Sequence, residues 1–516
     1  MQAHGELLLA LPFENTGGSP SVDWIGAAFP EILNQRFSAA GFLPISRDDR
    51  AYALDHLGLP PDFRPTRAST LRLAQALDAD SVIFGTYQVE ADATGTRITA
   101  TARVLDIANL RESAPITESA ELSRLPDVVN ALAWRITRQL DPTYAVAEQT
   151  FLAADANLRL DAFEAYVRGL VQGSAEDRVR HLRDAVRLDP NYGPAWLALG
   201  DASFAAQNYD QAAVAYGHLS RNDPNALQAD FHRGLAFFYT GKYLPAEDAF
   251  AFVSTRLPLP EVVNNQGVAA ARRGKDGAPL FQQAITGDPK DADYHFNLAL
   301  AYARRGDAPD AQKETAEALK LRPNDSELQA FASNLHNPGF LHAPDAGAGP
   351  GTQTPGPVNL PLERVKRSYD EAAFRQAAFE MEQMETLRAA TEPPAKRLAA
   401  LLADANRYGN AGLLVESERE YNRALAVDPN SAEAYAGLAR IRERTADRDA
   451  AKQLANRSVQ LHDNPAAHLV LARLALLANQ VPLAATEVEA ALRLDGNNAE
   501  ARGLRQAVAA RGGQVP

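Results

Sequence analysis

Cysteine is absent from this chain of 516 residues, and only three methionines and three tryptophans occur in it. Without thiols there is no disulfide, no thiolate ligand for zinc and no cysteine nucleophile. Long hydrophobic runs are missing as well. The longest, near Leu7–Phe13, is far shorter than the roughly 20 apolar residues that a membrane span requires. The sequence therefore predicts no integral membrane span.

Basic residues are outnumbered, with 52 Lys and Arg against 65 Asp and Glu and a formal net charge of -13. Nucleic-acid binding relies on clustered basic side chains that neutralise phosphates, so we expect no nucleic-acid partner. The missing cysteine favours an exported, periplasmic protein over a cytoplasmic one, although Met1–Gly5 shows no secretory signal. Nothing in the sequence indicates the oligomeric state.

Sequence motifs of catalysis and cofactor binding are also missing. No Gly-x-Ser-x-Gly elbow and no HExxH motif occurs. The Gly17–Gly18 turn lacks the lysine of a phosphate loop, which favours a plain turn over an anion site. His232 and His295 lie far apart in the sequence, and we expect packed or exposed imidazoles there rather than metal ligands. The chain is therefore predicted to be no enzyme and to hold no cofactor or metal.

What the chain does contain is a proline at nearly constant intervals. Pro190, Pro224, Pro258, Pro289 and Pro323 are separated by 34, 34, 31 and 34 residues. A fixed period indicates a repeat array, and 34 residues is the period of the tetratricopeptide repeat, a pair of helices. Proline suits the end of each pair because it has no amide hydrogen and cannot continue a helix.

The residues between these prolines resemble the tetratricopeptide pattern. Trp196, Gly200, Ala212 and Tyr216 supply the large and small side chains at the expected spacing. Five repeats are predicted over residues 146–335, and the 31-residue spacing is expected to reflect a shorter turn near Gly274–Gly277. The resemblance implies an all-α solenoid whose concave surface binds other proteins.

Three further segments follow this array. Residues 336–361 are rich in proline and glycine and predict a flexible linker. Residues 362–396 carry an apolar stripe at helical spacing, which includes Val365 and Phe374, and predict one long helix. Residues 397–516 repeat the tetratricopeptide pattern three times and end in a capping helix. The solenoid is therefore expected in two segments.

Residues 1–145 differ in pattern and predict a small α/β sandwich with a mixed sheet. Glu6–Phe13 is a strand without polar alternation, which indicates burial on both faces. The remaining expected elements are strands at 42–45, 81–90 and 97–106 and helices at 22–40, 68–77 and 125–140. With the solenoid, the predicted fold class is α+β overall.

This domain resembles the TolB amino-terminal-like domain in the stretches LLALPFEN, VDWIGAAFPEILNQRF, LAQALDADSVIFGTY and ITATARVLDI. The family often has a Gly–Trp pair after the last of these strands, but Ala108–Arg111 lacks the tryptophan, so no partner contact through it is predicted. The resemblance implies a bacterial adaptor, associated with the envelope or with regulation.

The predicted binding residues lie on the first helices of the first array, which line the concave face of such repeats. They are Phe204, Phe231, Phe238, Asn265 and Asn297. Exposed aromatic side chains in a groove are suited to anchor an extended or helical peptide. We therefore predict a non-enzymatic scaffold for protein or peptide partners. The alternative is a ligand-sensing regulatory protein whose amino-terminal α/β domain binds a small molecule, in a polar pocket near Asn15 and Gly17, or an envelope partner.

Overall fold

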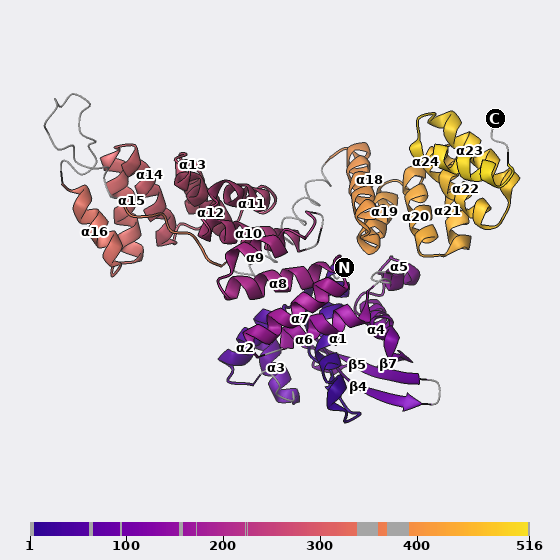
Figure 1. Ribbon diagram of the computed structural model, residues 1–516, viewed down its shortest axis with the longest axis horizontal. Coiled ribbons are helices and arrows are strands. Elements are labelled where there is room, and N and C mark those ends of the chain that lie inside the picture. Colours follow the sequence, from indigo (N-terminus) through magenta and orange to yellow (C-terminus); the bar gives the residue numbers. More distant parts are fainter. Residues whose placement is uncertain are drawn as a thin grey trace. The chain divides into compact units, whose positions relative to one another are not determined.

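The computed structural model describes residues 5–60, 66–92, 95–153, 158–171, 173–221, 223, 225–337, 360–368 and 392–513. The chain divides into two compact units. The amino-terminal unit comprises residues 1–167 together with 382–516, and the middle unit comprises residues 168–381. The class is α+β, as predicted from the sequence: a mixed sheet with helices, followed by arrays of paired helices (Figure 1).

A mixed sheet forms the centre of the amino-terminal domain. Its main order is β3–β1–β4–β5, β2 pairs with β4, and β6 and β7 both pair with β5. The pairs β1–β3, β1–β4 and β2–β4 are parallel, and the pairs of β5 are antiparallel. The strands are β1 Leu7–Ala10, β2 Glu14–Asn15, β3 Leu43–Pro44, β4 Ser81–Asp92, β5 Gly95–Asp106, β6 Arg111–Glu112 and β7 Ile116–Glu121.

Helices cover both faces of this sheet, and consecutive residues of the central strand β1, Leu8, Leu9 and Ala10, are buried, as expected for a strand that is covered on both faces. On one face, Phe29 of α1 stacks on Phe13 at 4.1 Å between ring centroids and also meets Tyr87 of β4. On the other, residues of α2 and α3 share a core cluster with Leu9 and Val82. The helices are α1 Trp24–Ala40, α2 Arg47–His56, α3 Arg67–Ala76 and α4 Leu125–Leu140, with 3₁₀ turns at Pro20–Val22 and Leu122–Arg124.

The first array follows as five consecutive helix pairs and one further helix. They are α6 Leu160–Val171, α7 Ala175–Leu188, α8 Gly193–Ala205, α9 Tyr209–Tyr216, α10 Ala226–Tyr239, α11 Tyr243–Arg256, α12 Pro260–Arg272, α13 Ala278–Gly287, α14 Ala292–Arg304, α15 Ala308–Leu321 and α16 Ser326–Leu335. As expected, position 200 requires a small residue, because the ring of Tyr216 lies so close that a Cβ at Gly200 would clash with it. Pro224 lies outside the described residues.

Two local predictions are corrected in this unit. The turn near Gly274–Gly277 is not shortened. Instead the following helix, α13, has 10 residues where α11 and α15 each have 14. The long helix does not begin at Leu362, because residues 360–368 are not helical. Most of the expected linker (338–359) and residues 369–391 of the expected helix lie outside the described residues.

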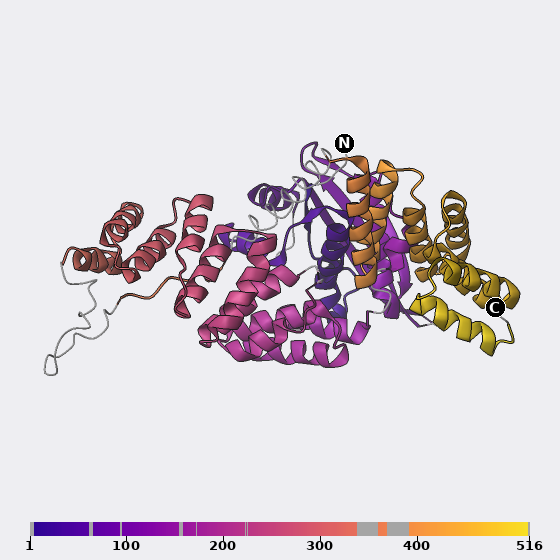
Figure 2. The ribbon, with the colours of Figure 1, turned by 90° about the horizontal axis from the view of Figure 1, so that it is seen from above.

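The second array belongs to the amino-terminal unit. Its helices follow one another toward the carboxyl end, from orange to yellow in Figure 2. They are α18 Pro394–Ala411, α19 Leu414–Val427, α20 Ala432–Arg444, α21 Arg448–Leu461, α22 Pro465–Leu477, α23 Val481–Leu494 and α24 Ala499–Ala510.

This array packs against the amino-terminal domain through α5 (Glu148–Ala153) and the segment before it. The backbone N–H of Ala147 donates to Glu418 Oε1 at 2.8 Å. Arg442 Nη1 donates to the hydroxyl of Thr150 at 2.6 Å, and Asn422 Nδ2 donates to the carbonyl oxygen of Ala145 at 3.2 Å. The second array is therefore held on the amino-terminal domain by polar bonds between residues about 270 or more positions apart.

A helix contact in this array yields the first stability prediction. A Cβ on Gly437 would lie 2.0 Å from Cζ of the buried Tyr421, so the chain must shift to accommodate Gly437→Ala. We expect this variant to lose about 2 to 3 kcal/mol of unfolding free energy, as overpacking of a core does. Gly503→Ala is the matched control, because nothing lies within 4 Å of its added Cβ. Its helix should gain about 0.5 to 1 kcal/mol. Hydrogen exchange measures both, because a chain with two compact units has no single unfolding midpoint. Equal protection of α19 and α20 in the two variants would contradict the expected close contact.

Candidate protein-interaction groove

An extended segment of the chain itself lies on the first helices of the first array. Residues Leu360–Ser368, here called the bound segment, contact α10, α12, α14 and the start of α16. We call the surface that these helices present to the segment the groove. In Figure 1 the bound segment is the short coil after the long grey trace that follows α16. Bound segment and groove both belong to the middle unit.

Asparagine side chains of the groove hold the backbone of the bound segment. Asn297 of α14 donates from Nδ2 to the carbonyl oxygen of Arg364 at 2.8 Å and accepts the N–H of the same residue at 2.7 Å. Asn265 of α12 makes the same pair of bonds with Lys366, at 2.8 and 2.7 Å. Asn264 donates to the carbonyl oxygen of Arg364 at 3.1 Å, and its own Oδ1 accepts a bond from Asn297.

The spacing of these contacts explains the conformation of the segment. In an extended chain, residues two positions apart direct their backbone groups to the same side. Arg364 and Lys366 meet this condition, and the two asparagines that bind them lie on α12 and α14, in successive repeats. Asn264, Asn265 and Asn297 are all fully buried, so their amide groups need partners, and the bound segment supplies them.

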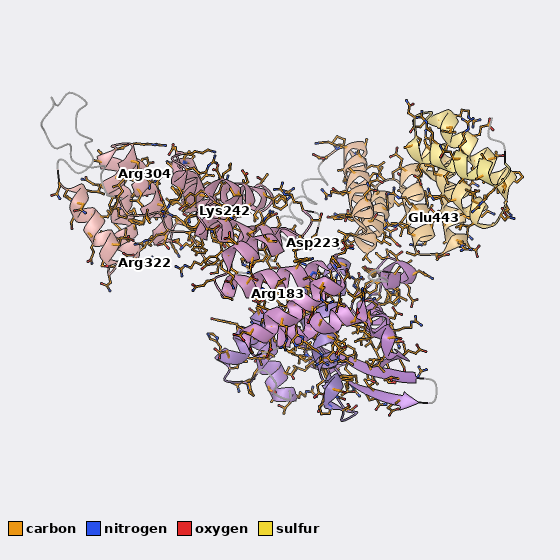
Figure 3. The ribbon with its side chains drawn as sticks, viewed as in Figure 1. Arg183, Asp223, Lys242, Arg304, Arg322 and Glu443 are labelled. Carbon is orange, nitrogen blue, oxygen red and sulfur yellow. The ribbon has the colours of Figure 1, made fainter. Side chains whose placement is uncertain are left out.

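A basic part of the groove surrounds Glu363. The side chain of Glu363 is fully buried and forms ion pairs with Arg272 of α12, at 3.0 Å, and with Arg304 of α14. Arg272 also donates to the carbonyl oxygen of Glu363 at 3.1 Å. Figure 3 labels Arg304 on the array. Because a buried carboxylate is stable only when paired, this position of the groove accepts a negative charge.

An acidic part of the groove surrounds the next basic residue. Arg364 pairs with Asp293 at 3.1 Å, with Asp325 at 2.7 Å and with Glu327 at 2.7 Å. Its guanidinium carbon also lies 4.3 Å from the centroid of the Phe296 ring, in cation–π geometry. This position therefore favours arginine, whose planar fork can meet several carboxylates at once.

The acidic part continues at the second basic residue. Lys366 Nζ lies 2.6 Å from Asp291 and 2.7 Å from Asp293. Burial by itself would raise the pKa of Asp293, but hydrogen bonds from Lys366, Arg322 and Arg364 lower this pKa to about 2. Arg322, labelled in Figure 3, follows the last residue of α15. Asp293 is therefore ionised at neutral pH and binds both basic residues of the segment.

Apolar and aromatic contacts along the segment complete the groove. Val365 packs against the two core clusters that Phe238 also joins, and Leu360 packs against the cluster around Phe296 and Phe331. The Arg367 guanidinium carbon lies 6.0 Å from the centroid of the Tyr239 ring. The bound segment thus covers apolar as well as charged surface.

The five residues predicted from the sequence fall into three groups. Asn265 and Asn297 lie in the groove and bind the segment. Phe238 is partly buried in the core clusters that Val365 joins, and Phe204 packs on Tyr209 and Tyr239. The prediction for Phe231 is wrong. This side chain is fully buried and packs on Phe250 as a core residue, so its ring is not available to a partner.

Several groove residues were not predicted. Asn264 could have been found, because it lies 33 positions before Asn297, close to one repeat period. No comparable sequence signal identifies the charged residues of the groove, because the chain has 52 basic and 65 acidic side chains and these do not stand out among them. They are Arg272, Asp291, Asp293, Arg304, Asp325 and Glu327.

The region named for the alternative, ligand-sensing hypothesis uses its polar groups internally. Asn15 Nδ2 donates to Asp23 Oδ1 at 2.7 Å and to the carbonyl oxygen of Ser19 at 3.0 Å. Asn15 Oδ1 accepts the N–H of Gly17 at 2.9 Å. The side-chain amide therefore stabilises the loop between β2 and α1.

Comparison with known proteins identifies the architecture of the first array. Family models described as tetratricopeptide repeat match residues 170–226 and 269–335. The chain therefore contains tetratricopeptide repeats over these residues. Repeats of this kind typically mediate protein–protein interactions, and neither matched model describes a catalytic domain. No curated protein matches the chain.

Solved structures are also similar to part of the chain. MamA of Desulfovibrio magneticus RS-1, from residue 41 to its end, is 22% identical, with a TM-score of 0.29 over 35% of this chain and 100% of that one. YrrB, described as a TPR protein with an unusual peptide-binding site, is 18% identical, with a TM-score of 0.31 over 37% of this chain and 99% of that one. No helix in the described part of the tetratricopeptide chain has the length and apolar character to cross a bilayer.

Proposed function

We propose that this protein is a non-enzymatic interaction scaffold whose first tetratricopeptide array binds an extended segment of a partner protein in the groove. The observation that carries the proposal is the pairing of Asn265 and Asn297 with both backbone groups of Lys366 and Arg364. Such bonds recognise an extended main chain whatever its side chains are. The same bonds can form with an internal segment of a partner chain, because no terminal carboxylate takes part in them.

We propose that the amino-terminal domain is a TolB amino-terminal-like domain, because it has the stretch LPFEN after strand β1 and the stretch ADSVIFG at the start of strand β4. A mixed sheet with helices on both faces supports this assignment. Its contacts with Glu418, Asn422 and Arg442 suggest a structural role as the support of the second array. The scaffold would then offer two tetratricopeptide surfaces on one chain.

A test of the groove requires a chain whose own segment has left it. Arg364→Pro with Lys366→Pro, here called the open variant, removes the two N–H groups that Asn297 and Asn265 accept and both basic side chains. A fluorescent nine-residue peptide with the sequence of residues 360–368 is then titrated and followed by anisotropy. The open variant should bind this peptide saturably.

Within the open variant, Asn297→Ala should weaken peptide binding by about 2 kcal/mol, or roughly 30-fold, because backbone groups are left unpaired. Asn334→Ala is the matched control, since Asn334 is exposed on α16 and its side chain is not among those that contact the segment. Equal affinities for the two variants, both folded by circular dichroism, would contradict binding through the asparagines.

A further inference from the structure

The groove carries charges of both signs in a fixed order along the bound segment. The pattern has four positions, which Glu363, Arg364, Val365 and Lys366 occupy in this order. Arg272 and Arg304 surround the first position. Asp293, Asp325 and Glu327 surround the second, and Asp291 and Asp293 surround the fourth. The third position, Val365, faces apolar core clusters. Because these side chains belong to the array, any segment that replaces the present one meets the same order of charges.

Burial makes this pattern selective. The side chain of Glu363 is fully buried, and those of Arg364 and Lys366 are only 19% and 20% exposed. A charge of the wrong sign at such positions meets like charges with little water to screen them. The groove therefore distinguishes Glu–Arg from Arg–Glu even though the asparagines bind the backbone of either.

On the basis of the proposed function, we propose that the partner carries an extended internal segment with the order Glu, Arg, aliphatic residue, Lys, and that residues 360–368 compete with it. The chain's own segment follows α16 after the 24 residues 336–359, so it is covalently linked to the groove that it occupies. A partner segment must match the charge pattern in order to displace it.

The experiment compares two labelled peptides of identical composition on the open variant. One has the native order, LPLERVKRS, and the other exchanges its Glu and Arg, LPLREVKRS. We expect the native peptide to bind at least 30-fold more tightly. Equal affinity would overturn the charge selection while leaving binding through the asparagines intact, and failure of both peptides to bind would overturn the proposed function itself.

The competition is tested with the native peptide alone. The unmodified full chain should bind it at least tenfold more weakly than the open variant, because its own segment occupies the groove. Identical affinities for the two chains would overturn the competition without affecting the charge selection. A circular dichroism spectrum and melting curve of the open variant, matched to those of the unmodified chain, exclude a folding defect as the cause.

Discussion

Replacing Arg442 by alanine is expected to lower the unfolding free energy of the amino-terminal unit by about 3 to 5 kcal/mol. Glu418 is 1% exposed, and its two carboxylate oxygens each accept a bond of 2.6 Å from the Arg442 guanidinium. Burial alone would lower the pKa of Arg442, but the hydrogen bonds to Glu418 raise it above the usual value. Without the arginine, the buried carboxylate keeps, among the bonds of the described residues, only the one from the N–H of Ala147.

Hydrogen exchange is the suitable measurement, because a chain with two compact units has no single well-defined unfolding midpoint. Protection of α5, α19 and α20 should fall, while α10–α15 of the middle unit stay unchanged. Arg448→Ala is the control, since Arg448 is an exposed arginine of the same array. Arg442→Met together with Glu418→Leu should recover most of the loss, because no buried charge then remains unpaired. Equal protection in Arg442→Ala and Arg448→Ala would refute the role assigned to this pair.

The repeat architecture was predictable because it depends on short-range regularities. Three helix pairs of the first array place a glycine of one helix against a ring of the other, Gly200 against Tyr216, Gly234 against Phe250 and Gly267 against Phe281, and the sequence repeats these choices at a nearly fixed period. The docking of the second array on the amino-terminal domain was not predictable in this way. It rests on individual polar bonds such as Ala147 to Glu418, which leave no periodic trace.

The bound segment shows why local pattern failed in the candidate site. Leu362, Val365 and the apolar residues after residue 368 have helical spacing, but residues 360–368 are extended. Their backbone groups are satisfied by Asn265 and Asn297, about 67 to 101 positions away, rather than by their own neighbours. Those asparagines were found because their place within the repeat assigned them to the concave face. The same rule assigned Phe231 wrongly: it lies 33 positions before Asn264, close to one repeat period, but its ring packs on Phe250 in the core.

Glu363→Lys is expected to release the bound segment from the groove and to abolish the protection of its amides. The substitution places a third positive charge between Arg272 and Arg304, at a site where the present side chain is fully buried. The N–H groups of Arg364 and Lys366, which donate to Asn297 and Asn265, should then exchange at least 100-fold faster. Hydrogen exchange of the full chain, read on peptides that cover residues 360–368, measures this directly.

Two further variants separate release of the segment from a general effect of charge. Glu317→Lys makes the same charge change on α15, where Glu317 pairs with the exposed Lys320, and should leave the protection of residues 360–368 unaltered. Arg304→Glu combined with Glu363→Lys restores opposite charges across the groove and should recover part of the protection, because attraction replaces repulsion at the same site. If Glu363→Lys left the amides of Arg364 and Lys366 fully protected, the ion pairs would not hold the segment. The asparagines alone would then account for its position.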